Sequence, residues 1–326
     1  MGRDLPLPML TAGLSPALAT ARLPSIAELV RSHNNDYSRF EPFFDPTPIA
    51  TSIVIPCYNH EALLLGTLRN LSQHPELLAH PDKFEIIVVD DGSPQPLAEL
   101  LKKEHCPCSL KILRQDFNQG AAAARNLGLQ LASGELVLFI DSDVRLPNGY
   151  FAAQWRVHNA VPQAVTVGLA ENLAPEDPRS QKPFDYSWQP DTSKDFRASN
   201  SSVYRDFPLN KTVRFLDESQ EFRHFEKAFS GSPWTLSEMV VGHNIGVRRT
   251  HALAIGGFDL RFSNYGSEDT FFGSRLIANG AFVVPLMNTG VFRTRHAPRK
   301  NDSNQQLVDS VKAAFRRVRI EQDSQP

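Results

Sequence analysis

Cysteine is scarce in this chain: only three of its 326 residues are cysteines. Cys57 stands far from Cys106 and Cys108 in the sequence, so the three cannot all pair, and no second half-site accompanies the HCPC stretch. A disulfide-stabilised small fold and a zinc-binding module are therefore both disfavoured. We expect a reduced, cytoplasmic protein in which Cys57 is a small packed residue of a strand.

Long apolar runs and a strong charge of either sign are also missing. No segment approaches the roughly 18 to 20 apolar residues that a membrane-spanning helix needs. The first residues, MGRDLPLPMLTAGL, lack the basic start and continuous apolar core of a secretory signal. The formal net charge of −2 gives no electrostatic reason to expect nucleic acid as a partner.

Two nucleotide-binding signatures are absent as well. No G-x-G-x-x-G follows the first apolar run and no G-x-x-x-x-G-K-[ST] occurs anywhere, which counts against dinucleotide-dependent dehydrogenases and P-loop enzymes. The chain instead alternates apolar strand patterns with amphipathic helix patterns. This alternation predicts an α/β fold with a mostly parallel central sheet flanked by helices on both faces. Two strands are expected to begin at residues 51 and 84, two more to span 110–113 and 136–140, and a fifth to end at residue 247. Helices are expected at 61–73, 97–104, 118–134, 267–279 and 305–321, and a short one from residue 250.

Length predicts one large domain with an elaboration, or two small domains, because 326 residues exceed the usual size of one simple core, and we expect a single large domain with an insertion. The proline-rich start packs outside the domain or serves as a docking arm. A polar, aperiodic stretch predicts a long loop or lid, whose aromatic residues stack on a sugar ring or fasten the loop to the core. The predicted divisions are an extension (1–48), a domain (49–300) with a nucleotide-binding half (49–146) and an acceptor and catalytic half (147–300), an insertion (174–233) and a C-terminal helix (301–326).

The predicted C-terminal helix is amphipathic, with Val311, Phe315 and Val318 set among arginines. This pattern would suit peripheral contact with an anionic membrane surface. Packing against the domain, or against a second subunit to make a homodimer, is the simpler interpretation.

Acidic residues end the strand predicted at 136–140. Asp141 and Asp143 are separated by one residue, and side chains at positions i and i+2 of an extended segment point to the same side. Ligands of open α/β sheets bind at the carboxyl ends of the strands, and PCYN, DDGS and DSD end three of the predicted strands. Two carboxylates at that edge would suit a hard divalent cation that bridges phosphate oxygens. The alternative is a simple turn after a strand.

Six motifs occur in a fixed order: VIPCYN, VVDDGS, NQGAAAARNLGL, FIDSDV, GGFDLRF and GSEDTFFGSRL. Together they resemble the family-2 nucleotide-sugar glycosyltransferases of the A-type fold, over about residues 50–298 without the insertion. The GGFD…ED-x-x-F-x-x-R pattern is also similar to chondroitin-type polymerases and polypeptide N-acetylgalactosaminyltransferases. The resemblance implies inverting transfer of a sugar, a hexose or N-acetylhexosamine, from a nucleoside diphosphate to an acceptor hydroxyl, usually with Mn²⁺ or Mg²⁺.

The resemblance also implies a metal site at the acidic pair. Asp143 would hold the ion, with Asp141 beside it contacting the ribose or a metal-bound water. His296 is a candidate further ligand, or alternatively a surface histidine of a basic loop. In that loop, Arg293 and its basic neighbours would neutralise diphosphate charge or simply be solvated.

A nucleoside site is implied at the ends of the first strands. A carboxylate at Asp91 that accepts the imide N–H of uracil would select uridine, whereas the preceding Asp90 would serve the backbone turn. Arg125 matches a position that approaches the nucleotide; the alternative is a salt bridge on a helix surface. The nucleotide-binding residues implied in this way are Pro56, Tyr58, Asn59, Asp91, Arg125, Asp141 and Ser142.

Asp269 is our candidate general base, because a hydroxyl is a poor nucleophile until it is deprotonated. One base without an enzyme nucleophile gives inversion by single displacement. Glu268 would bind the acceptor or the donor sugar, although acids are also favoured at a helix start by the helix dipole. The implied donor and acceptor pocket is completed by His243, Asn244, Trp234 as part of a lid, and Tyr265 in place of the Trp of the chondroitin-type Trp-Gly-Gly.

Two other functions compete with sugar transfer. A nucleotidyltransferase that makes the activated sugar would want an N-terminal glycine-rich loop, and residues 51–60 contain no glycine. A non-catalytic relative that binds a nucleotide sugar is the second alternative, and the presence of Asp143 and Asp269 counts against it.

Overall fold

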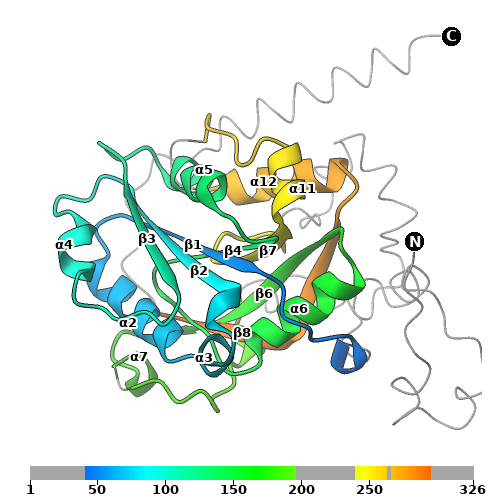
Figure 1. Cartoon of the computed structure of the whole chain (residues 1–326), viewed down its shortest axis with the longest axis horizontal. Coiled ribbons are helices and arrows are strands. Elements are labelled where there is room, and N and C mark those ends of the chain that lie inside the picture. The colour runs from blue at the N-terminus through cyan, green and yellow to red at the C-terminus, as the bar shows by residue number, and fades with distance from the viewer. Residues whose placement is uncertain (1–40, 182, 196–238, 263–265, 295–326) are drawn as a thin grey trace, which may run out of the picture.

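A computed structural model describes residues 41–181, 183–195, 239–262 and 266–294, which form one mixed sheet with helices on both faces (Figure 1). The strands are β1 (Thr51–Cys57), β2 (Phe84–Asp90), β3 (Ser109–Arg114), β4 (Leu136–Ile140), β5 (Val144–Arg145), β6 (Ala164–Leu173), β7 (Asn244–Arg248) and β8 (Phe282–Thr294). The helices are α2 (Glu61–Ser72), α3 (Pro75–Ala79), α4 (Leu97–Leu101), α5 (Ala121–Leu131), α6 (Tyr150–Ala160), α7 (Pro178–Gln181), α11 (Arg249–Ala254) and α12 (Glu268–Ala278).

In the described part of the chain the strand order is β3-β2-β1-β4-β7-β6-β8-β5. Strands β1 to β4 are parallel to one another, so their carboxyl ends meet at one edge. β7 runs antiparallel to both β4 and β6, β6 is parallel to β8, and β5 is antiparallel to β8. The predicted α/β fold with a mostly parallel sheet is confirmed, and its second half is mixed because β7 enters in the opposite direction.

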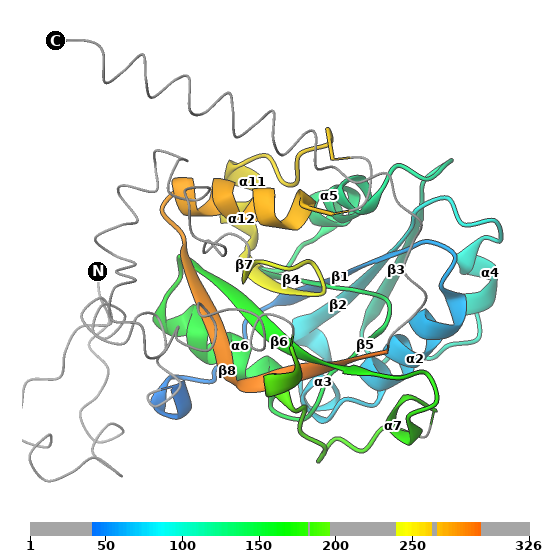
Figure 2. The ribbon, with the colours of Figure 1, turned by 180° about the vertical axis from the view of Figure 1, so that it is seen from behind.

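The side chains of β4 alternate between two apolar cores. Val137 and Phe139 belong to the core shared with α5, α11 and α12, whereas Leu136, Leu138 and Ile140 belong to the core shared with α2, α4 and α6. Because both faces of the strand are buried, its sequence is an unbroken apolar run. Figures 1 and 2 show the two helix layers on opposite faces of the sheet.

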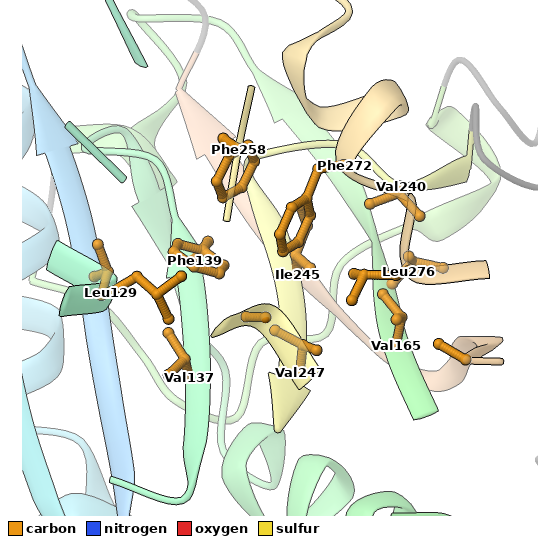
Figure 3. Packing of buried hydrophobic residues seen from close by; sticks show 14 of the residues in the cluster. Leu129, Val137, Phe139, Val165, Val240, Ile245, Val247, Phe258, Phe272 and Leu276 are labelled. Carbon is orange, nitrogen blue, oxygen red and sulfur yellow. The ribbon is translucent and has the colours of Figure 1, made fainter. Parts of the chain in front are cut away.

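Aromatic packing fixes α12 relative to β4. The ring of Phe139 lies edge-on to those of Phe258 and Phe272, with centroids 5.1 and 6.0 Å away, and the latter two rings stack at 4.0 Å (Figure 3). Arg275 of α12 donates a hydrogen bond to the carbonyl of Gly257 at 2.9 Å. Residues of the GGFD and F-x-x-R motifs therefore pack and hydrogen-bond to one another, which positions α12 and the acidic residues at its start.

The described part of the predicted insertion is tied to β6. Glu171 is buried and accepts hydrogen bonds from Arg179 at 3.0 and 3.1 Å and from Lys194 at 2.9 Å. These ion pairs hold 174–195 against the sheet. The remainder of 174–233, most of the N-terminal extension and the whole C-terminal helix lie outside the described residues, so the domain divisions remain predictions.

Some element boundaries differ from those expected. The helix expected at 97–104 ends at Leu101, and Glu104 beyond it pairs with Arg69 of α2 at 2.9 Å. The next helix begins at Ala121 with Gly120 at its N-cap, rather than at Asn118, because the glycine takes a φ of 92° that turns the chain into the helix. Helix α6 and strand β6 were not anticipated from the sequence.

The cysteines are free within the fold. Cys57 is buried in β1, as expected, and Cys106 and Cys108 lie with their Sγ atoms 3.3 Å apart. Across the described ranges, no helix combines the length and the apolar character needed to cross a bilayer.

Gly246 of β7 is required by the packing of a buried polar network. A Cβ atom there would lie 2.3 Å from Thr166 Oγ1 and 2.5 Å from Gln154 Oε1, two atoms that hydrogen-bond to each other. We expect Gly246→Ala to lower the free energy of unfolding by about 1–3 kcal/mol, measured by urea denaturation. The matched control is Gly66→Ala, because the atoms nearest to its Cβ would belong to the end of the flexible Arg145 side chain, the closest at 3.1 Å. Equal effects of the two changes would contradict this account.

Candidate active site

The two acids that follow β4 contact the same cation. Arg293 Nε lies 3.2 and 3.0 Å from the two carboxylate oxygens of Asp143, and its Nη2 lies 3.2 Å from Asp141 Oδ2. The side chain of Asp143 is 2% exposed, that of Asp141 24% and that of Arg293 27%. Both carboxylates therefore face one positive group at the carboxyl edge of the sheet, and their role as metal ligands remains a prediction.

Arg125 of α5 is a buried bridge between the two halves of the chain. Its Nη2 lies 3.0 Å from Asp141 Oδ1 and its Nη1 lies 2.9 Å from Glu268 Oε1. The guanidinium also lies 5.4 Å from the ring centroid of Phe258. Only 4% of the Arg125 side chain is exposed, so the salt bridge it makes is internal and not on a helix surface.

Asp269 lies in the first turn of α12, where backbone groups orient its carboxylate. Oδ2 accepts a hydrogen bond from the N–H of Gly242 at 2.8 Å, and Oδ1 accepts one from the N–H of Thr270 at 2.7 Å. Burial and then the neighbouring carboxylate of Glu268 raise the pKa of Asp269 to about 6, while Arg125 acts in the opposite direction. A carboxylate with a pKa near 6 is mostly deprotonated at neutral pH, and it is a stronger base than an ordinary carboxylate.

Negative charge exceeds positive charge among these groups. The guanidiniums of Arg125 and Arg293 pair with three carboxylates, those of Asp141, Asp143 and Glu268, and the charge of Arg125 also acts on a fourth, that of Asp269. Burial acts to raise the pKa of Asp141, but the two guanidiniums and nearby His243 hold it below its ordinary value. The cluster is therefore able to accept further positive charge.

The acidic pair fits a divalent cation in chemistry and in placement. Asp141 and Asp143 supply hard carboxylate oxygens that converge on one positive group, and nucleotide-associated Mg²⁺ is held by one or two carboxylates together with phosphates. No group of three His, Cys, Asp or Glu side chains suited to a metal ion is found among the described residues. His296, the predicted further ligand, lies outside them.

The carboxylates of Asp90 and Asp91, at the end of β2, both accept hydrogen bonds from backbone N–H groups. Asp90 accepts hydrogen bonds from the N–H groups of Ser93 at 2.8 Å and Leu97 at 3.1 Å, as expected for a turn residue. Asp91 accepts from the N–H groups of Gln119 at 2.8 Å and Gly120 at 3.0 Å, just before α5. The predicted contact of Asp91 with a nucleobase would use the remaining lone pairs of these oxygens.

The residues predicted around the nucleoside lie at the carboxyl end of β1. Pro56 belongs to β1, and Tyr58 and Asn59 come directly after its last residue. Asn59 has a φ of 55°, and its N–H donates to Ser93 Oγ at 3.0 Å, which joins the ends of β1 and β2. These three residues therefore lie beside Asp91 at the same edge of the sheet.

Ser142, His243 and Asn244 are all buried. The carbonyl of Ser142 accepts a hydrogen bond from Thr67 at 2.8 Å. Asn244 accepts one from Tyr150 at 2.6 Å, so its side chain lies toward α6, on the face of β7 opposite to Ile245. His243 is near Asp141, where it contributes to the low pKa of that acid. Predicted residues Trp234 and Tyr265 lie outside the described part of the chain.

Gly242 is a functional position that the sequence reasoning missed. Its N–H holds Asp269, and a Cβ atom on it would lie 2.2 Å from Arg125 Nη2. Only glycine therefore leaves room for the buried guanidinium beside the carboxylate. The signal in the sequence was the glycine directly before the His-Asn pair.

Comparison with known families identifies the chain. A family model described as Glycosyl transferase family 2 matches residues 52–216, just over half of the sequence. The chain belongs to this family.

Curated relatives and solved structures agree with that assignment. The chain is 28% identical over 250 residues to validoxylamine A glucosyltransferase of Streptomyces hygroscopicus subsp. limoneus, covering 72% of this chain and 51% of the relative. It is 25% identical over 282 residues to chondroitin synthase of Escherichia coli, covering 84% and 38%. The chain thus spans about half the length of these relatives or less.

A solved structure shares the fold. The mannosyltransferase PcManGT from Pyrobaculum calidifontis, in complex with GDP-Man and Mn²⁺, superimposes with a TM-score of 0.51 at 19% sequence identity, covering 84% of this chain and 69% of that one. The α/β architecture described above is therefore that of the A-type glycosyltransferases.

Proposed function

We propose that this chain is a metal-dependent, inverting glycosyltransferase that moves a sugar from a UDP-sugar to an acceptor hydroxyl. The observation that carries the proposal is the continuous link from the acidic pair after β4, through Arg125, to the acidic start of α12. It joins a candidate cation site to a candidate base within one cluster. Family membership supplies the class of reaction.

Asp141 and Asp143 would hold the divalent ion, Mn²⁺ or Mg²⁺. When bound, such an ion stabilises the negative charge that develops on a departing diphosphate. The chain's own guanidiniums add to this: Arg125 is fixed beside Asp141, and Arg293 lies within reach of both acids. Charge stabilisation by preorganised groups is commonly the largest part of such a rate enhancement.

Asp269 would take the proton of the acceptor hydroxyl. Its two oxygens are oriented by the N–H groups of Gly242 and Thr270, so the carboxylate is held before a substrate arrives. Glu268, held by Arg125 at 2.9 Å, would bind the acceptor or the donor sugar. No covalent intermediate is required, and a single displacement inverts the anomeric centre.

Incubation with a panel of nucleotide sugars and Mn²⁺ tests the proposal. We expect slow release of UDP from a UDP-sugar without an acceptor, faster release with the right acceptor, and no release in excess EDTA. Release of pyrophosphate from UTP and a sugar phosphate would favour the nucleotidyltransferase instead. Binding of UDP without turnover of any donor, with or without a wide range of acceptors, would favour the non-catalytic relative.

The proposal also covers the cellular location and the oligomeric state of the protein. A cytoplasmic protein that contacts membranes at most peripherally, with a homodimer as one arrangement, remains the expectation from composition. The insertion (174–233) and the C-terminal helix (301–326) are expected to decide the acceptor.

A further inference from the structure

Cys106 and Cys108 lie side by side in the loop between α4 and β3 (Figure 1). Their Sγ atoms are 3.3 Å apart, so one thiol donates a hydrogen bond to the other. A disulfide bond would bring the two sulfurs to a separation of about 2.0 Å, which requires the side chains to move by only about 1 Å. The geometry of the loop therefore favours a bond between these two cysteines.

The two thiols of this pair are half-buried rather than enclosed. They pack partly against one apolar core, while the residues on either side of the pair, His105 and Ser109, are exposed. Cys57, by contrast, is 3% exposed within β1. The chain thus carries one accessible pair of thiols and one enclosed thiol, which serves as an internal reference.

The thiols also differ in acidity. The hydrogen bond with Cys108 lowers the pKa of the Cys106 thiol to about 7, although burial acts in the opposite direction. The same hydrogen bond, then burial and the charge of Cys106, raise the pKa of Cys108. Burial raises the pKa of Cys57 to about 11. Because the thiolate is the nucleophile in disulfide exchange, Cys106 is the thiol that reacts first.

We propose that Cys106 and Cys108 form a redox-active dithiol, which exchanges with small-molecule disulfides of the glutathione type to give a reversible internal disulfide. Disulfides that form outside oxidising compartments are usually transient and catalytic or redox-sensing. The pair precedes the first residue of β3, at the amino edge of the parallel strands, whereas the acidic pair follows the carboxyl end of β4. The dithiol is therefore a separate site, and its chemistry does not depend on sugar transfer.

The exchange takes two displacements at sulfur. In the first, the Cys106 thiolate attacks one sulfur of the external disulfide, a mixed disulfide forms, and the other half leaves as a thiolate that takes up a proton. In the second, Cys108 releases its proton to solvent, its thiolate attacks Cys106 Sγ, and the remaining external half leaves as a thiolate. The two protein thiols are oxidised to one disulfide, and the external disulfide is reduced to two thiols.

The order of these steps follows from the contacts of the pair. Once Cys106 is in the mixed disulfide, its sulfur carries no negative charge, so the charge that raises the pKa of Cys108 is gone. Cys108 then ionises more readily, and in the reduced protein its Sγ already lies 3.3 Å from the atom that it attacks. We therefore expect the mixed disulfide to be short-lived in the wild-type protein.

The test incubates the full reduced chain with glutathione disulfide at neutral pH, alkylates the remaining thiols and locates each modification by peptide mass spectrometry. We expect an internal Cys106–Cys108 disulfide, lighter than the dithiol by two hydrogen atoms and reversed by dithiothreitol, with Cys57 unmodified until the chain is unfolded. The proposal is overturned if no internal disulfide forms, if glutathione stays attached to the pair, or if Cys57 reacts first.

Two variants assign the separate roles of the thiols. Cys108→Ser lacks the second nucleophile, so glutathione should accumulate on Cys106. Cys106→Ser retains only the less acidic thiol: a pKa of about 7 instead of 8.5 gives roughly 16-fold more thiolate at neutral pH, and the weaker nucleophilicity of an acidic thiolate reduces this advantage to about threefold. We expect Cys106→Ser to react at least about threefold more slowly than the wild type.

The matched control for both variants is Ser109→Ala, which changes the exposed neighbour of the pair and leaves both thiols in place. It should form the internal disulfide at the wild-type rate. Equal rates of modification for Cys106→Ser and the wild type, or an absence of bound glutathione in Cys108→Ser, would contradict the assigned order of attack. The wild-type measurement needs no substitution, so it decides the proposal even if a variant does not fold.

Discussion

Asp269→Asn should lower the rate of sugar transfer by orders of magnitude while preserving the fold and donor binding. The amide keeps the size of the side chain but cannot accept the proton of an acceptor hydroxyl. General base catalysis typically contributes about 10²- to 10⁴-fold, and we expect a loss in kcat of that order. The measurements are the initial rate of glycoside formation and, separately, the affinity for UDP.

The pH dependence of transfer gives an independent check on the same carboxylate. The pKa of Asp269 is raised to about 6, chiefly by burial, so the proton-accepting form is lost as the pH falls through 6. The rate should decline on the acid side of this value and level off above it. The exposed Asp116→Asn serves as the control. Wild-type transfer by Asp269→Asn would remove this residue as the base.

Asp143→Ala is expected to have the second large effect, a loss of about a thousandfold in transfer. That factor corresponds to roughly 4 kcal/mol of transition-state stabilisation, the scale of a metal ion acting on developing phosphate charge. The change removes both oxygens that contact Arg293 and should leave donor hydrolysis undetectable. Transfer is measured across a series of Mn²⁺ concentrations.

The control for this variant is Glu99→Gln, which neutralises an exposed acid that pairs with Lys102. Its transfer rate should match that of the wild type at every Mn²⁺ concentration. Full activity of Asp143→Ala, or of the wild type in excess EDTA, would show that the acidic pair does not act through a metal.

The first half of the fold was predictable because its signals are local. β4 reads as an apolar run since both of its faces are buried, and the acids that follow it mark the ligand edge. Asp141 and Asp143 both contact Arg293, as the sequence suggested, but they follow β4 in a turn, so the period-2 alternation of an extended strand is not what brings them together. Each of these inferences needs only a few neighbouring residues.

The remaining site features depend on partners far apart in the chain. Arg125 and Glu268 are separated by 143 positions, so the burial of that salt bridge had no local signal. The antiparallel course of β7 likewise depends on which strand it joins, and that is set by tertiary packing. A lone glycine such as Gly242 carries no sequence signal of its own, and its requirement is seen only when the Arg125 side chain is placed beside it.

The carboxylate of Asp91 at the start of α5 bears on how any anion could be recognised. Asp91 accepts hydrogen bonds from the N–H groups of Gln119 and Gly120. A negative charge therefore already lies at the N-terminus of α5, the positive end of the helix dipole. A phosphate there would meet repulsion, unlike in folds where a helix start cradles phosphate. At this edge of the sheet the positive charge for an anionic ligand would then come from side chains such as Arg125, which is buried, so its attraction should be screened only weakly as ionic strength rises.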